Sequence, residues 1–284
     1  MIPAVPKAEL HVHLEGTAKP EPVRRIAARN GLALPPGLFA DDETFAWRDF
    51  LDFLNTYDLA ASVIRTARDY RDIVFAYLSD CAAEGAIYVE LISSPDHARA
   101  VGLTEEEHRA GLFQGIDDAR AAHGIEGRII VVAIRNFGPE AAERTAAEAA
   151  ALPHPYVVGF NLAGDEAGYP PPPFTRAFEI ARDAGQGCTV HAGEHAGPQS
   201  VEQALALPGV TRISHGVRAV EDPSSSGAWP APGSCWRSVR PRTSRSAPRC
   251  CRRCPTCSRS FAVAGVVGRS VPPAADGVPY KKGE

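Results

Sequence analysis

Short apolar segments alternate along the chain with longer segments whose apolar residues recur every three or four positions. The short segments have the length and composition of buried strands, while the longer ones have the period of helices that pack on a core. The predicted strands are residues 7–17, 86–92, 127–134, 156–162, 187–194 and 210–216. The predicted helices are residues 20–31, 45–70, 70–85, 104–123, 139–152, 174–184 and 199–206.

A strand followed by a helix, repeated six times, predicts a parallel sheet covered by helices. No strand is followed by G-x-G-x-x-G, and G-x-x-x-x-G-K-[ST] does not occur, so the phosphate-binding loops of Rossmann and P-loop proteins are absent from the sequence. We therefore expect an α/β protein of the (β/α)₈ TIM-barrel type, apparently incomplete because strands seven and eight are not recognisable. In such a barrel the carboxyl ends of the strands form the active site.

The composition agrees with a globular enzyme. The chain has 284 residues, of which 44% are hydrophobic and 23% are charged. No apolar run is long enough to span a membrane, and the first residues, MIPAVPKAEL, lack the basic and apolar regions of a signal peptide. These features predict a cytoplasmic protein.

The charge is divided sharply along the chain. From Ser224 onward there are 11 Lys and Arg residues but only 2 Asp and Glu residues, a net charge of +9. The preceding residues contain 19 basic and 32 acidic residues, a net charge of −13. We therefore predict two regions: a barrel over residues 1–222, with six βα units and a helical insertion after the first strand, and a tail over residues 223–284.

The tail is rich in Arg, Ser, Pro and Cys and shows no helical or strand period, apart from an apolar run at residues 261–268. This composition is typical of a disordered segment or of a frameshift in a GC-rich gene. Cys251, Cys254 and Cys257 have the C-x₂-C-x₂-C spacing of some metal sites, but a structureless Arg- and Pro-rich run is a poor context for one. The Arg residues could bind nucleic acid non-specifically, although no aromatic residues interleave with them.

Two imidazoles and a carboxylate follow one another on the first predicted strand, in KAELHVHLEGT. Because strand side chains alternate between faces, His11, His13 and Glu15 are expected to point one way, and the intervening apolar residues the other. Neutral imidazoles side by side offer two nitrogens to one cation. H-x-H alone is a weak signal, and a surface strand with two His residues would show the same spacing.

Later strands also end in residues that carry chemistry. NLAGDE follows the fourth strand, HAGEH contains His191 and Glu194 at the fifth, and SHG contains His215 at the sixth. Strand ends converge in a barrel, so three imidazoles, including those of the first strand, could hold one Zn²⁺ or a similar divalent ion. Glu194 could donate a proton to a ring nitrogen, and His215 could accept one from water. Gly164 has no side chain to keep a flat ligand from its backbone N–H.

The segments ELHVHLEGT, NLAGDE, TVHAGE and ISHG, in this order and at this spacing, resemble the adenosine deaminase family of zinc-dependent barrels. The resemblance covers roughly residues 5–222. It implies one Zn²⁺ per chain held by His11, His13 and His191, proton donation from Glu194 to purine N1, and assistance from His215 to hydroxide attack at C6. It also implies a small-molecule purine as partner, with His13, Glu15 and Gly164 beside it, and deamination of adenosine to inosine.

Other hypotheses stay open at this point. Relatives that deaminate adenine or aminodeoxyfutalosine carry nearly the same motifs, and no residue separates these substrates. The family pattern also has an Asp ligand after the eighth strand and a second Asp beside it, whereas this chain has only Asp276 after Asp222. That departure favours a metal-binding barrel fragment without catalysis. A nucleic-acid-binding protein would rest on the tail alone and is disfavoured.

Overall fold

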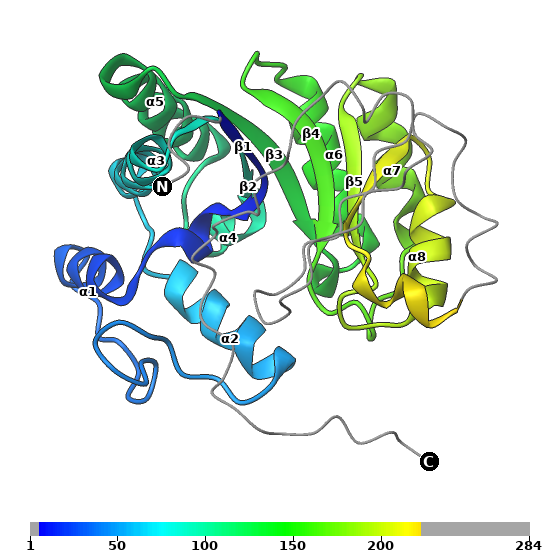
Figure 1. Ribbon diagram of the computed structural model, residues 1–284, viewed down its shortest axis with the longest axis horizontal. Helices are drawn as coiled ribbons and strands as arrows, with labels where there is room; N and C mark the ends of the chain where they lie inside the picture. The colour runs from blue at the N-terminus through cyan, green and yellow to red at the C-terminus, as the bar shows by residue number, and fades with distance from the viewer. Residues whose placement is uncertain (1–5, 223–284) are drawn as a thin grey trace.

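The computed structural model describes residues 6–222 and places six parallel strands in one sheet. Neighbours in sequence are neighbours in the sheet, in the order β1-β2-β3-β4-β5-β6 (Figure 1). The strands are β1 (Lys7–His13), β2 (Ala86–Ser93), β3 (Glu126–Ile134), β4 (Val157–Ala163), β5 (Gly187–Ala192) and β6 (Val210–His215). This order is that of a barrel wall, and the predicted α/β fold of the incomplete TIM-barrel type is confirmed.

Helices connect the strands, and most of them cover the outer face of the sheet. The helices are α1 (Pro20–Arg29), α2 (Phe50–Ala61), α3 (Ala67–Ala83), α4 (Pro95–Ala100), α5 (Glu105–His123), α6 (Pro139–Ala151), α7 (Thr175–Asp183) and α8 (Pro198–Leu205). Helix α2 lies at the carboxyl edge of the sheet, beside the turn that follows β1 (Figure 1). Short 3₁₀ turns are η1 (Leu14–Thr17), η2 (Arg135–Phe137), η3 (Pro172–Phe174) and η4 (Val217–Glu221). Across the described residues, none of the helices combines the length and the apolar character needed to cross a membrane.

Apolar side chains hold these helices to the sheet in two main clusters. Leu78, Val89 and Ile116 belong to the cluster of the first three strands, and Phe160 and Phe178 to that of the last three. Burial of such side chains stabilises a fold by about 1.5–3 kcal/mol each. The strands are thereby fixed with their carboxyl ends at one edge, which is the edge that carries the predicted site.

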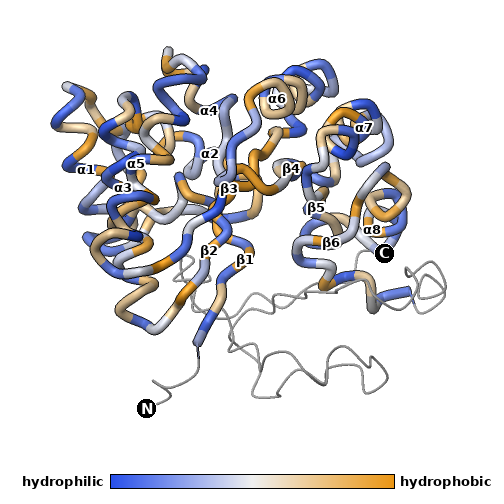
Figure 2. Tube along the Cα trace, turned by 90° about the horizontal axis from the view of Figure 1, so that it is seen from above, coloured by the Kyte–Doolittle hydropathy of each residue, from blue (hydrophilic) through white to orange (hydrophobic). Residues whose placement is uncertain are grey.

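The sheet curls until its first and last strands face each other. Figure 2 shows the strands along a curved line, with α3 and α5 towards one end and α7 and α8 towards the other. Arg212 of β6 donates a hydrogen bond of 2.6 Å to Glu90 of β2, across the concave face. The rings of His11 on β1 and His215 on β6 are 4.8 Å apart between centroids. Within residues 6–222, β1 and β6 each pair with one strand only.

Two predicted elements were wrong in their extent, and one helix was not predicted. β1 ends at His13, so Glu15 lies in the η1 turn and not on the strand. The helical pattern over residues 45–70 is divided, because α2 ends at Ala61 and Thr66 begins a new helix with its side chain as N-cap. The short helix α4 was not predicted. Predictions for residues 223–284, including the Cys and Arg motifs, lie outside the described residues.

Asp69 shows how the N-terminus of α3 is fixed beneath the insertion after β1. Its carboxylate is fully buried and accepts hydrogen bonds from the Asn30 side chain at 2.9 Å and from the backbone N–H groups of Arg65 and Thr66 at 3.0 and 2.9 Å. Arg29 pairs with it as well. Burial alone would raise the pKa of Asp69, but these donors outweigh burial and lower it.

Asp69→Ala is expected to lower the free energy of unfolding at pH 7 by about 3 kcal/mol, because several buried donors lose their acceptor. The folded pKa is below the unfolded one, so this stabilisation is present above about pH 4 and is lost as the pH falls through the folded value. Urea unfolding of both proteins at pH 7 and below pH 4 tests the prediction. A difference that does not shrink in acid would contradict it.

Candidate active site

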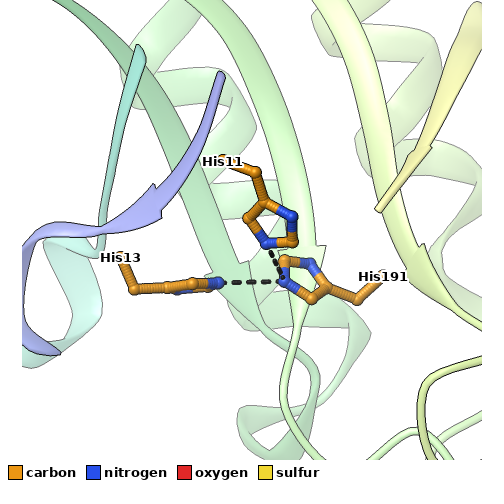
Figure 3. A group of neighbouring side chains, drawn as sticks. All are labelled: His11, His13 and His191. Carbon is orange, nitrogen blue, oxygen red and sulfur yellow. Dashed lines mark hydrogen bonds between the residues drawn. The ribbon is translucent and has the colours of Figure 1, made fainter. Parts of the chain in front are cut away.

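Three imidazoles meet at the carboxyl edge of the sheet. His11 and His13 come from β1 and His191 from β5, and Figure 3 shows their Nε2 atoms directed at one point. The His11 and His13 Nε2 atoms each lie 2.9 Å from Nε2 of His191. His191 is buried, while the other two are partly exposed. The structure thus brings together residues separated by about 180 positions, as the sequence predicted.

The three imidazoles are neutral at physiological pH. Burial lowers the pKa of His13 to about 3 and takes those of His11 and His191 well below their usual value, and neighbouring His side chains lower all three further. Neutral imidazoles present lone pairs, and a set of three nitrogen donors suits Zn²⁺. The three donor atoms form a compact set suitable for one metal ion, so the residues present fit the predicted metal.

Two residues that the sequence analysis did not single out orient His191. Its Nδ1 lies 2.8 Å from Oδ1 of Asn161 on β4, which fixes the tautomer with the proton on Nδ1 and leaves Nε2 as an acceptor or ligand. Arg135, in η2 after β3, is fully buried and donates a hydrogen bond of 2.7 Å to the His191 carbonyl oxygen. Asn161 could have been suspected from its place in NLAGDE, but no pattern marks Arg135.

Glu194 and His215 lie beside the three imidazoles. Oε1 of Glu194, in the loop after β5, is 3.3 Å from Nε2 of His215 at the end of β6. Burial, and then the negative charge of Glu166, raise the pKa of Glu194 to about 7. Burial lowers the pKa of His215 to about 4. At neutral pH the site therefore holds a carboxyl group that can donate a proton next to an imidazole that can accept one.

The backbone of His215 is strained. Its φ of 67° makes it the one non-glycine residue with positive φ among residues 6–222. His adopts this left-handed region more often than most residues, but at a cost in free energy. The conformation turns the chain at the end of β6 and leaves the imidazole beside both His11 and His191, at centroid distances of 4.8 and 5.1 Å.

Glu15 is close to the site but is already engaged within the protein. It is 1% exposed. One carboxylate oxygen accepts hydrogen bonds from Ser93 Oγ at 2.8 Å and the Ser94 N–H at 3.1 Å, and the other accepts from the Tyr57 hydroxyl at 2.9 Å. Tyr57 belongs to α2, whose first residue, Phe50, stacks on the ring of His195 in the loop after β5. The helix therefore connects the end of β1 with the Glu194 loop.

The backbone conformation and close packing at position 164 require a glycine. Its φ is 111°, and a Cβ atom there would lie 2.3 Å from Oδ1 of Asn136. That Asn136 oxygen accepts a hydrogen bond of 2.9 Å from the Asp165 N–H. Gly164 thus lets the end of β4 pack against η2, beside the strand ends that carry the imidazoles.

This chain is similar to known proteins in sequence and in structure. A family model described as adenosine deaminase matches residues 6–228. Adenine deaminases of Chelativorans sp. (strain BNC1) and Sinorhizobium medicae (strain WSM419) are each 48% identical, over 217 and 216 residues, and each alignment covers 76% of this chain. The alignments cover 66% of these relatives, so the chain spans just under two thirds of their length.

Solved structures share the fold of the described residues. An adenine deaminase from Arthrobacter aurescens superposes with a TM-score of 0.73 at 31% identity, covering 79% of this chain and 68% of that protein. An amidohydrolase from Burkhoderia ambifaria, with bound Zn, superposes with a TM-score of 0.70 at 29% identity and covers 78% and 61% of the two chains.

Proposed function

Because the chain belongs to the adenosine deaminase family, we propose that it catalyses the hydrolytic deamination of a 6-aminopurine and that the purine is adenine. In this reaction water replaces the amino group at C6, and hypoxanthine and ammonia are the products. The observation that supports it most is the meeting of three neutral imidazoles with the Glu194–His215 pair at one edge of the sheet. This set combines a metal site with a proton donor and a proton acceptor.

His11, His13 and His191 are the residues that would hold the metal, which we propose to be one Zn²⁺ per chain. When bound, such an ion lowers the pKa of water towards about 7 and so supplies hydroxide at neutral pH. Asn161 keeps the His191 ring in the orientation and tautomer that expose Nε2. Because the ring is already held in this orientation, binding the metal costs less free energy of ordering.

Glu194 and His215 would move the protons. Addition of hydroxide at C6 places negative charge on the purine ring, and a protonated Glu194 can neutralise it by donating to N1. Neutral His215 can accept a proton from the attacking water. The same hydrogen bond directs the water oxygen towards C6. Their 3.3 Å separation is short enough for the two groups to act on neighbouring atoms of one bound ring, Glu194 at N1 and His215 at the water that attacks C6.

Adenine, not the expected adenosine, is the finer proposal for the substrate. Curated relatives at 48% identity are named adenine deaminases. The geometry supports the same choice, because both oxygens of Glu15 are occupied by Tyr57, Ser93 and Ser94. A carboxylate that is 1% exposed and already accepts three hydrogen bonds is poorly placed to accept another from a ribose hydroxyl, so a nucleoside gains little from it. We also propose that the backbone of Gly164 contacts the purine ring.

Ammonia release from adenine, adenosine and aminodeoxyfutalosine, measured in parallel on the zinc-loaded chain, tests the proposal. Adenine is expected to be the fastest of the three. Because this chain has only Asp276 after Asp222, its rate is expected to stay below that of a relative with the strand-eight Asp that the family resemblance implies. Faster release from adenosine would overturn the choice of substrate.

The rate with adenine is expected to fall as the pH rises above about 7. Glu194 must carry a proton to act as the acid, and its pKa of about 7 means that each further pH unit removes about nine tenths of the remaining active form. The measurement is kcat/KM between pH 6 and pH 9. A value that stays level to pH 9 would show that Glu194 is not the proton donor.

A further inference from the structure

Glu166 makes an unusual set of contacts immediately after β4. Its carboxylate is 2% exposed and accepts hydrogen bonds from five uncharged donors. Oε2 accepts from the backbone N–H groups of Glu194, His195 and Ala196 at 3.1, 2.9 and 3.0 Å. Oε1 accepts from the Gly193 N–H and from the Ser200 hydroxyl.

The four backbone donors are consecutive and surround one anion. Successive N–H groups that point to one side of the chain form an anion-binding concavity, and here the anion is a side chain of the protein itself. Residues 193–196 form the loop between β5 and α8, which begins at Pro198. A loop without regular structure is thereby given a fixed conformation by one side chain from the neighbouring strand.

We propose that Glu166 is a positioning residue for the reaction, which holds the Glu194 carboxyl in the site and keeps it in its proton-donating form. This inference rests on the proposed role of Glu194. The contacts account for both effects, because the Glu194 N–H is itself one of the five donors and the loop that carries Glu194 surrounds the Glu166 carboxylate. Hydrogen bonds to a buried charge are the strong ones, so the loop loses most of its support without it.

The electrostatics agree with this geometry. Among the charges around Glu194, that of Glu166 raises its pKa, whereas those of Arg135 and His195 lower it. His191 and His215 also lie close to the Glu194 carboxylate, and burial lowers the pKa of both rings, so both stay neutral near pH 7. The donors to Glu166 carry no net charge. They therefore do not cancel its negative charge, which acts on the Glu194 carboxyl.

The test compares Glu166→Gln with Glu202→Gln in the full chain without added metal. Glu202 is an exposed residue of α8, so its variant makes the same chemical change outside the network. In Glu166→Gln, amide hydrogen exchange at residues 193–196 is expected to be about tenfold faster or more, and the Glu194 titration midpoint, followed by ¹³C-carboxyl NMR, about one pH unit lower. Glu202→Gln is expected to match the native chain in both.

Native exchange in Glu166→Gln would overturn the proposal, and so would faster exchange with an unchanged Glu194 midpoint, which would leave Glu166 a structural role only. If Glu166→Gln does not fold, Glu166→Asp decides: it keeps the charge but withdraws it from the loop, so both changes are expected in smaller measure, and native values would overturn the proposal. Failure of the proposed function is seen separately, as the absence of ammonia release from adenine.

Discussion

Replacing Glu194 with Gln is expected to lower the rate of ammonia release from adenine by about 10²–10⁴-fold, the usual contribution of general acid catalysis. The amide keeps the shape of the side chain but has no proton to give to a ring nitrogen. Burial and the Glu166 charge hold the native carboxyl near the pKa at which it can donate at neutral pH. The substitution therefore removes chemistry and leaves the surrounding packing in place.

The control is Glu202→Gln, on the exposed face of α8, which is expected to keep the native rate. The assay is run on the 284-residue chain and on a hybrid in which residues 223–284 are replaced by the matching segment of an adenine deaminase relative. The family resemblance implies an Asp after the eighth strand in that segment. Because misdirected water can cost 10²-fold or more, the hybrid is expected to be faster. Equal rates for Glu194→Gln and the native protein in the hybrid would contradict the assigned role.

Replacing His191 with Ala is expected to abolish stoichiometric zinc binding. The native chain should hold one zinc, and the variant should bind it more than about 100-fold more weakly, because the loss of an outer partner alone costs 10–100-fold. His191 is the imidazole whose Nε2 lies 2.9 Å from both of the others, so its removal leaves two donors from one strand. Elemental analysis after dialysis gives the stoichiometry, and competition with a chelator gives the affinity.

Asn161→Ala provides a graded comparison. It leaves all three imidazoles but removes the acceptor that lies 2.8 Å from Nδ1 of His191, so an intermediate loss of affinity of about 10–100-fold is expected. His154→Ala is the matched control for His191→Ala, because it removes an imidazole that stacks on Phe113 away from the site. A His191→Ala protein that retains one zinc would show that other donors, such as Cys251, Cys254 and Cys257, hold the metal.

The position of the site could be predicted because parallel strands bring their carboxyl ends together. His191 and His215 are far from His11 and His13 in sequence, and the repeated strand and helix pattern alone was enough to expect them at one edge. The same pattern gave six of the strands in the correct order. To predict the three metal ligands, it was enough to know which residues stand at the strand ends.

The support of the site could not be predicted in this way. Glu166 accepts four of its five hydrogen bonds from backbone N–H groups, and Arg135 donates to a backbone carbonyl. Backbone partners leave no pattern of side chains in the sequence, so neither residue could be recognised from spacing. Glu15 was misplaced for a related reason, because strand periodicity continues past His13 in the sequence while the backbone turns into η1. Such turns depend on tertiary contacts, here with Tyr57 and Ser93.

The central claim is that the imidazoles at the ends of β1 and β5 form the metal site of a purine deaminase. X-ray absorption at the zinc edge, on the 284-residue chain loaded with one equivalent of zinc, tests it most directly. The account predicts a first shell of nitrogen and oxygen at about 2.0–2.1 Å, with the outer scattering of several imidazoles. A shell of sulfur at about 2.3 Å would place the metal on cysteine and contradict the account.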